Sequence, residues 1–345
     1  MNFDLDENQT LFKDTVERFC APVDIATRTK MRRMAHGFDP ARWNELAELG
    51  MIGLAATEAD GGLGGSALDC AVVAQALGQG LAVEPWLECG FLPAKLLTGT
   101  PYAADVVNGT AMATLAFAEA AGRYTLDARA VSVRAGKLSG EKRFVLSAAA
   151  ADFFIVTAHT DGDTQLYAVP RGAAGVDVRL YPVTDGSLAG VVTFRDVAVD
   201  APFAGMNRLL SAIDGARLMA SAEMVGVAQR LFADTLAYVK TREQFGKPIG
   251  SFQVIQHRMV DVYSKCESIQ SALYRALLQP GVSAEGVKAF VAEEATWVGQ
   301  QAVQLHGGMG MTDELGIGHA LKRILLLSKL FGDPASGYAQ LAKAA

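Results

Sequence analysis

Hydrophobic residues change their spacing twice along the chain. In the first third, and again from about residue 207 to the end, apolar side chains recur every three or four positions, which is the spacing of one helical face. From about residue 112 they instead alternate with polar residues or form short β-favouring runs, as strands do. We therefore predict a mainly helical fold with a central antiparallel β domain. Its parts are an N-terminal helical domain over 1–111, a β-barrel-like domain over 112–206 and a C-terminal four-helix bundle over 207–345.

The same spacing predicts where individual elements lie. The expected helices of the first domain cover 11–19, 43–49 and 70–77. The expected strands, with turn-forming glycine and aspartate residues between them, cover 131–133, 153–157, 166–169 and 191–194. The bundle helices are expected at 212–241, 252–278, 283–305 and, as a shorter fourth helix, at about 319–331.

Composition excludes several classes of protein. A chain of 345 residues exceeds what one ordinary core fills, so more than one domain is expected. A net charge of −6 without a basic cluster argues against nucleic-acid binding, and no run reaches the roughly 18 apolar residues that membrane insertion requires. The acidic start of the chain does not resemble a signal peptide, and the four cysteines have neither metal-ligand nor disulfide-framework spacing. We expect a cytoplasmic protein without a metal site.

Two sequence motifs in the predicted bundle say more about function than the composition does. Residues 241–249 read TREQFGKPI and are followed by Ser251, Phe252 and Gln253, and residues 302–311 read AVQLHGGMGM. Both motifs resemble signatures of the acyl-CoA dehydrogenase family, and segment 46–54 with the glycine-rich loop after it resembles that family's N-terminal domain. Residues 310–323 are similar to the small-subunit type of pimeloyl-CoA dehydrogenase. The resemblance covers essentially the whole chain.

The resemblance implies FAD as the cofactor. In this family FAD lies at a subunit interface, with its flavin ring on the middle domain of one subunit and its diphosphate and adenine on the bundle of another. The forked guanidinium of Arg242 suits the diphosphate, Phe245 would lie against the cofactor, and glycines let the backbone approach the phosphates. Taken singly, such residues are more often packing or solvated residues, but together in family order they favour FAD binding. The expected set is Arg242, Phe245, Gln253, Gln304, Gly307 and Gly308.

Three polar residues near the second motif have structural interpretations. His306 adjoins the two glycines, but the sequence places no nucleophile or carboxylate partner beside it, so we interpret it as a packing or interface histidine. Asp313 and Glu314 have no partners at metal-ligand spacing and are expected to cap or solvate a turn.

The catalytic base of the family has no counterpart here. Dehydrogenation of an acyl thioester needs a base that takes the α-proton and a flavin that accepts hydride. The resemblance places the family's glutamate either at Phe331 or Gly332, or at Ala216, directly before the substrate-orienting arginine that Arg217 matches. None of these positions is a glutamate.

Two acidic residues are alternative bases. Glu223 lies seven residues after Ala216 on nearly the same helix face, about 10 Å further along the axis. Asp333 adjoins the other family position but is shorter than glutamate by one methylene.

The predicted flavin-ring side also departs from the family. The family has a threonine–glutamate pair and then glycine, serine and aspartate, but the matching segment here, which runs from Phe117 through Ala118 and Arg123 to Tyr124, lacks them. The family's tryptophan and threonine over the ring are matched here by Phe144 and Leu146. The losses therefore fall on the ring side, while the adenine-side residues remain. This asymmetry predicts a small subunit that completes the FAD site of a larger, catalytically complete subunit.

Two alternatives remain open. One is a self-sufficient homo-oligomer with a relocated base, and the other is a noncatalytic scaffold on the same fold. The resemblance implies an acyl-CoA substrate, bulky or dicarboxylic for the small-subunit type, and electron-transfer flavoprotein as the electron acceptor. It leaves the acyl chain length open.

Overall fold

The described chain divides into two compact units, each discontinuous in sequence. A computed structural model describes residues 4–122 and 124–344, apart from the side chain of residue 344. The first unit, called the bundle unit here, comprises Met1–Thr29, Ala67–Ala82 and Arg217–Ala345. The second, called the sheet unit, comprises Lys30–Ser66 and Val83–Ala216.

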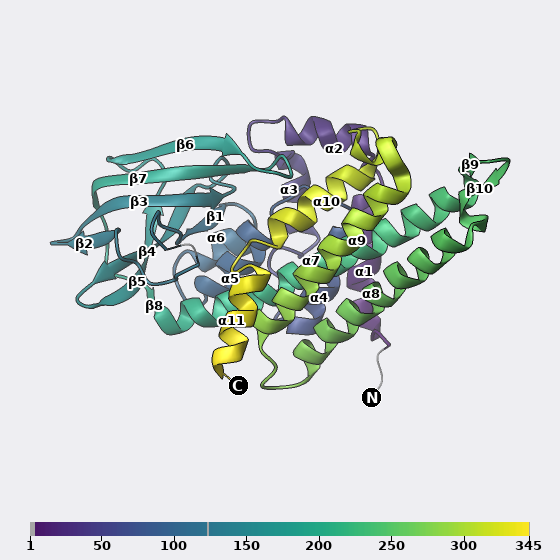
Figure 1. The fold of residues 1–345 in the computed structure, drawn as a ribbon. Coiled ribbons are helices and arrows are strands. Elements are labelled where there is room, and N and C mark those ends of the chain that lie inside the picture. The colour runs from purple at the N-terminus through teal and green to yellow at the C-terminus, as the bar shows by residue number, and fades with distance from the viewer. Residues whose placement is uncertain (1–3, 123, 345) are drawn as a thin grey trace. The chain divides into compact units, whose positions relative to one another are not determined.

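Long helices build the bundle unit (Figure 1). Helix α9 is central, because it packs against α8, α10 and α11, while α1 packs on α4. Helix α7 supplies its part from Arg217 onward. The helices are α1 (Glu7–Cys20), most of α2 (Ile25–Arg32), α4 (Ala67–Gln79), α7 (Met206–Thr241), α8 (Gln253–Leu278), α9 (Ala284–His306), α10 (Gly316–Leu327) and α11 (Pro334–Ala344). Short elements between them are β9 (Glu243–Gln244), β10 (Lys247–Pro248), η3 (Ile249–Ser251) and η4 (Gly307–Met311).

Local signals set the ends of these helices. Asp6 accepts a hydrogen bond from the backbone of Gln9, whose side chain bonds back, so that α1 begins with a capping box. Ser283 caps α9 by accepting from the backbone N–H of Gly286. Helix α9 ends where Gly307 adopts φ 60°, which glycine reaches without a Cβ penalty.

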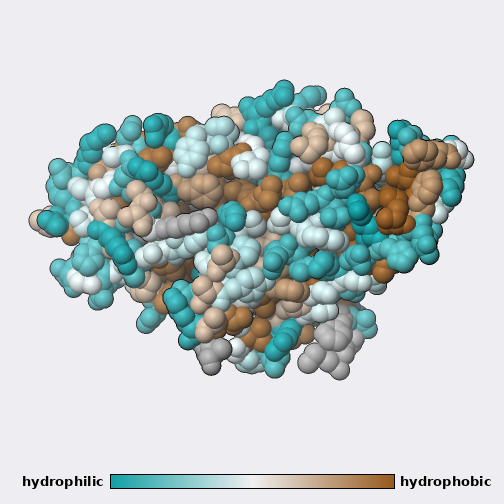
Figure 2. Space-filling view, viewed as in Figure 1, coloured by the Kyte–Doolittle hydropathy of each residue, from teal (hydrophilic) through white to brown (hydrophobic). Residues whose placement is uncertain are grey.

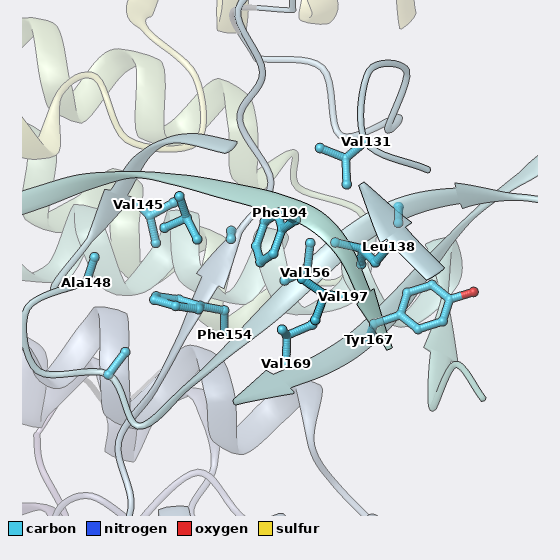
Figure 3. Close-up of a cluster of buried hydrophobic side chains, with 14 residues drawn as sticks. Val131, Leu138, Val145, Ala148, Phe154, Val156, Tyr167, Val169, Phe194 and Val197 are labelled. Carbon is cyan, nitrogen blue, oxygen red and sulfur yellow. The ribbon is translucent and has the colours of Figure 1, made fainter. Parts of the chain in front are cut away.

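The sheet unit is organised around one sheet. Its strands run in the order β6-β7-β3-β2-β4-β5-β8, and β1 lies parallel beside β4. In the core, Phe154, Val169 and Phe194 come from β4, β5 and β7 (Figure 3). The strands are β1 (Ala113–Ala116), β2 (Ser132–Arg134), β3 (Lys137–Leu146), β4 (Phe153–Thr160), β5 (Asp163–Pro170), β6 (Val176–Pro182), β7 (Leu188–Ala198) and β8 (Ala204–Gly205).

Shorter helices complete the sheet unit. One of them, η2, is a buried π-helix, and α7 supplies Met206–Ala216 to the unit. These elements are α3 (Pro40–Glu48), η1 (Glu58–Asp60), η2 (Trp86–Phe91), α5 (Leu92–Leu96) and α6 (Ala103–Val107).

The predicted fold class is confirmed: helical segments come first, strands in the middle and long helices last. The prediction missed strands β1, β3, β6 and β8 and helices α2, α5, α6 and α11, besides the shortest elements. Strand β3 is interrupted by irregular register near Gly140 and between Lys142 and Val145, so its residues do not alternate cleanly. Strand β6 does alternate, with Val176, Val178 and Leu180 between Asp177 and Arg179, but this run was not predicted as a strand. The domain ranges 1–111, 112–206 and 207–345 stay a prediction. None of the described helices is both long and apolar enough to cross a membrane.

Candidate cofactor and catalytic sites

The first motif forms an exposed hairpin after α7. The backbone N–H of Arg242 donates to the carbonyl of Tyr238 (2.8 Å), which ends the helix, and the chain then turns through β9 and β10. At the tip, Phe245 and Gly246 adopt φ 55° and 79°. Phe245 is 93% exposed, and its ring meets Phe252 edge-on. A bulky residue in the left-handed region is strained, so the fold presents this ring to solvent at an energetic cost.

The second motif lies at the end of α9. Gln304 and the two glycines after His306 are exposed. Gly307 needs its φ of 60°, but Gly308 has no such constraint, and a Cβ added to Gly308 would meet no atom within 4 Å. The described chain therefore does not itself require glycine at position 308. The open space beside this backbone fits the close approach of another molecule.

Both motifs lie at the same end of the bundle unit. The rings of Tyr238 and His306 stack with centroids 4.2 Å apart, and Val239, Met259 and Leu305 form a small core beside them. Figure 2 shows hydrophobic side chains exposed beside polar ones at this end, where Met311 is 74% exposed. The structure thus groups the predicted cofactor residues in two neighbouring exposed segments. They are Arg242, Phe245, Gln253, Gln304, Gly307 and Gly308.

This set fits a dinucleotide. An exposed guanidinium can pair with a diphosphate, amides can donate and accept, and open glycine backbone can approach phosphate oxygens. Within the described ranges, no group of three or more His, Cys, Asp or Glu side chains could hold a metal ion.

The first position predicted for the family's base, Phe331 or Gly332, lies in a fixed loop between α10 and α11. Arg217 Nε donates to the carbonyl of Phe331 (2.9 Å), and Lys288 Nζ donates to the carbonyls of Ser328 (2.8 Å) and Gly332. Phe331 and Gly332 both have left-handed φ values, 56° and 125°. The loop is therefore held by Arg217 and Lys288, and a buried phenylalanine lies at the position predicted for the glutamate.

The two alternative bases both make folding contacts. Glu223 forms a buried, two-pronged ion pair with Arg323, in which Oε1 lies 2.6 Å from Nε and Oε2 lies 3.0 Å from Nη2. Asp333 Oδ1 accepts from the backbone N–H of Ser336 (2.9 Å) and so caps α11. Ala216, the second position predicted for the base, is fully buried. Glu223 and Asp333 each make a structural contact of their own.

Sequence reasoning missed two residues of this cluster, Glu285 and Lys288. Glu285 Oε1 lies 3.3 Å from Arg217 Nη2 and 3.5 Å from where a Cβ on Gly332 would stand, so a carboxylate does border the base position. Lys288 is 2% exposed on the apolar face of α9. A lysine on an otherwise apolar stripe was the available signal, since a buried charge needs partners.

Lys288 should make stability depend on pH. Burial, followed by the charge of Arg217, lowers the pKa of Lys288 to about 7. The unfolded chain has an ordinary lysine pKa of about 10.4, so between those values the unfolded state holds a proton that the folded state lacks. The free energy of unfolding should therefore rise with pH from about 7 towards 10, by at most about 1.4 kcal/mol per pH unit from this group.

Urea unfolding of the wild type and of Lys288→Met at pH 7 and pH 9 checks this expectation. The free energy of unfolding of the wild type should rise relative to that of Lys288→Met as the pH rises from 7 to 9. Lys329→Met is the control, because that lysine lies in the loop after α10 that Lys288 binds, and its side chain is 53% exposed. An equal pH response of the wild type and Lys288→Met would contradict the assignment.

In the sheet unit, the segment predicted to face the flavin makes internal contacts. Glu119 accepts hydrogen bonds from the backbone of Arg129, Ala130 and Val131 and from Lys142 Nζ (2.7 Å). Burial alone would raise the pKa of Glu119, but these donors outweigh it and hold the pKa below its ordinary value. The carboxylate is thus used inside the unit. Arg123, part of the same prediction, lies outside the described residues.

The two predicted ring-covering residues differ in exposure. Phe144 is 38% exposed with φ 53°, whereas Leu146 is buried and its carbonyl accepts from Thr114 Oγ1 (2.8 Å). Neither side chain offers a hydrogen bond to a ligand.

His306 and Asp313 have structural contacts of the kind the sequence suggested. His306 is buried in its stack on Tyr238, and Asp313 is exposed in a turn, 3.4 Å from Lys322 Nζ.

Comparison with known proteins gives matches over the whole chain. The model of the acyl-CoA dehydrogenase N-terminal domain matches residues 6–91, and that of the C-terminal domain matches residues 204–345. Acyl-CoA dehydrogenase IpdE2 of Mycolicibacterium smegmatis is 30% identical, with 96% of each chain covered. The solved ChsE4-ChsE5 complex from Mycobacterium tuberculosis has a chain 25% identical with TM-score 0.88, covering 99% of this chain and 98% of that one. The FAD complex of PigA is 25% identical with TM-score 0.89, covering 100% and 99%.

Proposed function

Because this chain belongs to the acyl-CoA dehydrogenase family, we propose that it is the subunit of a heteromeric acyl-CoA dehydrogenase that lacks its own catalytic base. The chain is an oxidoreductase of that family, and its cofactor is FAD, which accepts hydride from the acyl group. The observation that carries the proposal is the base loop. Arg217 and Lys288 hold it, and the position proposed for the base is a buried phenylalanine, Phe331.

The bundle unit would supply the adenine half of the FAD site. Arg242 would pair with the diphosphate, Gln253 and Gln304 would bond polar groups of the cofactor, Phe245 would cover it, and Gly308 would admit the phosphates to the backbone. The exposure of these side chains and the open space at Gly308 support this role. Arg217 is proposed to orient the substrate.

The partner is proposed to be a larger acyl-CoA dehydrogenase subunit that carries the glutamate. The ChsE4-ChsE5 neighbour, a complex of two named chains, supports assembly of this kind. The proposal also includes an acyl-CoA substrate, electron-transfer flavoprotein as the electron acceptor and a cytoplasmic location. It takes the chain to be like the small subunit of pimeloyl-CoA dehydrogenase. Co-purification of the chain with the products of neighbouring genes, followed by a flavin spectrum, tests the assembly. A chain that purifies alone and without flavin would contradict it.

Replacing Arg242 with alanine should reduce flavin retention in the assembled oligomer. The diphosphate would lose a charge-assisted hydrogen bond of about 1.5 to 3 kcal/mol, which corresponds to roughly 10- to 150-fold in affinity. Flavin absorbance per protein after gel filtration measures the effect, and Gln304→Ala should change it in the same direction.

Arg275→Ala is the matched control for the arginine variant. Arg275 is also exposed, lies on α8 outside both motifs and bonds Gln279. Full flavin content in both Arg242→Ala and Gln304→Ala would reject the cofactor role.

A second candidate function is a self-sufficient homo-oligomer with a relocated base. One observation favours it: the Glu285 carboxylate borders the base position beside Arg217. Activity of the chain alone separates the two candidates, and no catalytic turnover with or without a partner would favour the noncatalytic scaffold.

A further inference from the structure

The ends of α7 and α9 are joined by an aromatic contact. The ring of Tyr238 on α7 stacks on the ring of His306, the last residue of α9, with 4.2 Å between centroids and 23° between planes. His306 is 6% exposed, and Tyr238 is half-buried. Neither residue belongs to the set assigned to the cofactor.

His306 is fixed on three sides. Its Nδ1 donates to the carbonyl of Ala302 (2.8 Å), because a carbonyl can only accept. The loop after α9 folds back so closely that a Cβ on Gly310 would lie 3.1 Å from the Cβ of His306. Tyr238 covers the ring face. Contacts on these sides leave the imidazole little freedom to move.

The stack lies between the two halves of the proposed cofactor site. Arg242 follows Tyr238 by one helical turn and donates its backbone N–H to the Tyr238 carbonyl (2.8 Å). Gln304 precedes His306 by two residues, and Gly308 follows it by two. These two rings therefore join the segment that carries the guanidinium to the segment that carries the glycines.

We propose that the Tyr238–His306 stack is a positioning device that holds the hairpin and the glycine loop at the separation one FAD molecule requires. The proposal rests on the FAD role of Arg242 and Gln304 set out above. Both segments would contact the same FAD molecule, so a separation fixed in advance removes ordering that binding would otherwise have to supply. The two rings act through their neighbours and need not touch the cofactor.

Four variants of the full chain, in the oligomer in which it purifies, test the proposal. FAD is removed, the apoprotein is titrated with FAD, and the dissociation constant is read from flavin fluorescence, while thermal unfolding of the apoprotein is measured separately. We expect His306→Ala and Tyr238→Leu each to raise the dissociation constant about tenfold. His306→Phe, which keeps a stacking ring, should restore it to within about twofold, and the double variant His306→Ala/Tyr238→Leu should be no worse than either single one.

A merely structural role would lower the unfolding temperature and leave the dissociation constant unchanged, and that result overturns the proposal. Should His306→Ala fail to fold, Tyr238→Leu decides the question at the half-buried partner. If Tyr238→Leu binds FAD as tightly as the wild type while Arg242→Ala binds it more weakly, the positioning role of the stack is rejected. The role of Arg242 in binding FAD is then kept. Wild-type affinity in Arg242→Ala removes the cofactor role itself.

Discussion

The purified chain on its own is expected to show little or no acyl-CoA dehydrogenase activity, even when it carries flavin. The two positions predicted for the base hold Phe331, or its neighbour Gly332, and the fully buried Ala216, and Glu223 is paired with Arg323. A general base commonly contributes about 100- to 10,000-fold in rate, so its absence should outweigh modest changes in affinity. Activity should appear when a glutamate-bearing partner subunit is added.

The assay follows reduction of flavin or of an artificial acceptor by a panel of acyl-CoAs, with the chain alone and with the partner. Glu223→Gln, Asp333→Asn and Glu285→Gln are made in parallel, and circular dichroism checks that each variant is folded. Turnover that requires the partner and persists in all three variants supports the incomplete subunit. Robust turnover by the chain alone, abolished by one of these changes, would establish the self-sufficient enzyme and name its base.

The second large effect is expected at Gly226, where α4 and α7 cross. A Cβ on Gly226 would lie 1.9 Å from the carbonyl oxygen of Gln75, and one on Gly78 would lie 2.2 Å from that of Glu223. Both obstacles are backbone atoms of packed helices, which cannot turn aside as a side chain can. Gly226→Ala should therefore lower the free energy of unfolding by about 3 kcal/mol or more, or prevent folding.

Gly172→Ala is the control for this substitution. A Cβ there would meet no atom within 4 Å, and its φ lies outside the left-handed region. Urea unfolding should place Gly172→Ala within about 0.5 kcal/mol of the wild type. A Gly226→Ala variant as stable as the wild type would mean that the two helices do not cross this closely.

Local pattern was enough to predict most of the architecture. Strands β4 and β5 were predicted because their buried residues form β-favouring runs, and α7, α8 and α9 because their apolar faces repeat over many turns. The predicted fourth bundle helix extended to 331, but α10 ends at Leu327. The carbonyls of the next residues are bound instead by Lys288, which lies 40 residues from Ser328 in sequence. Such distant side-chain contacts leave no local signal.

In the candidate site, too, residues in contiguous motifs could be predicted, but contacts between distant residues could not. Arg242, Gln304 and Gly308 could be named because they belong to contiguous motifs, although the sequence could not tell that Tyr238 and His306 bring those motifs together. Glu285 was not predicted, because its relation to Gly332 depends on how α9 packs beside the loop. The structural contacts of Glu223 were likewise hidden, since Arg323 lies 100 residues away.

The exposed tip of the hairpin bears on how flavin content depends on protein concentration. Phe245 is 93% exposed in a strained turn, so the free chain gains little from holding it there. If its ring is covered only when FAD and a second subunit are both in place, each of the two binds more tightly in the presence of the other, because linkage is reciprocal. Dilution below the subunit dissociation constant would then release flavin, and excess FAD would hold the subunits together.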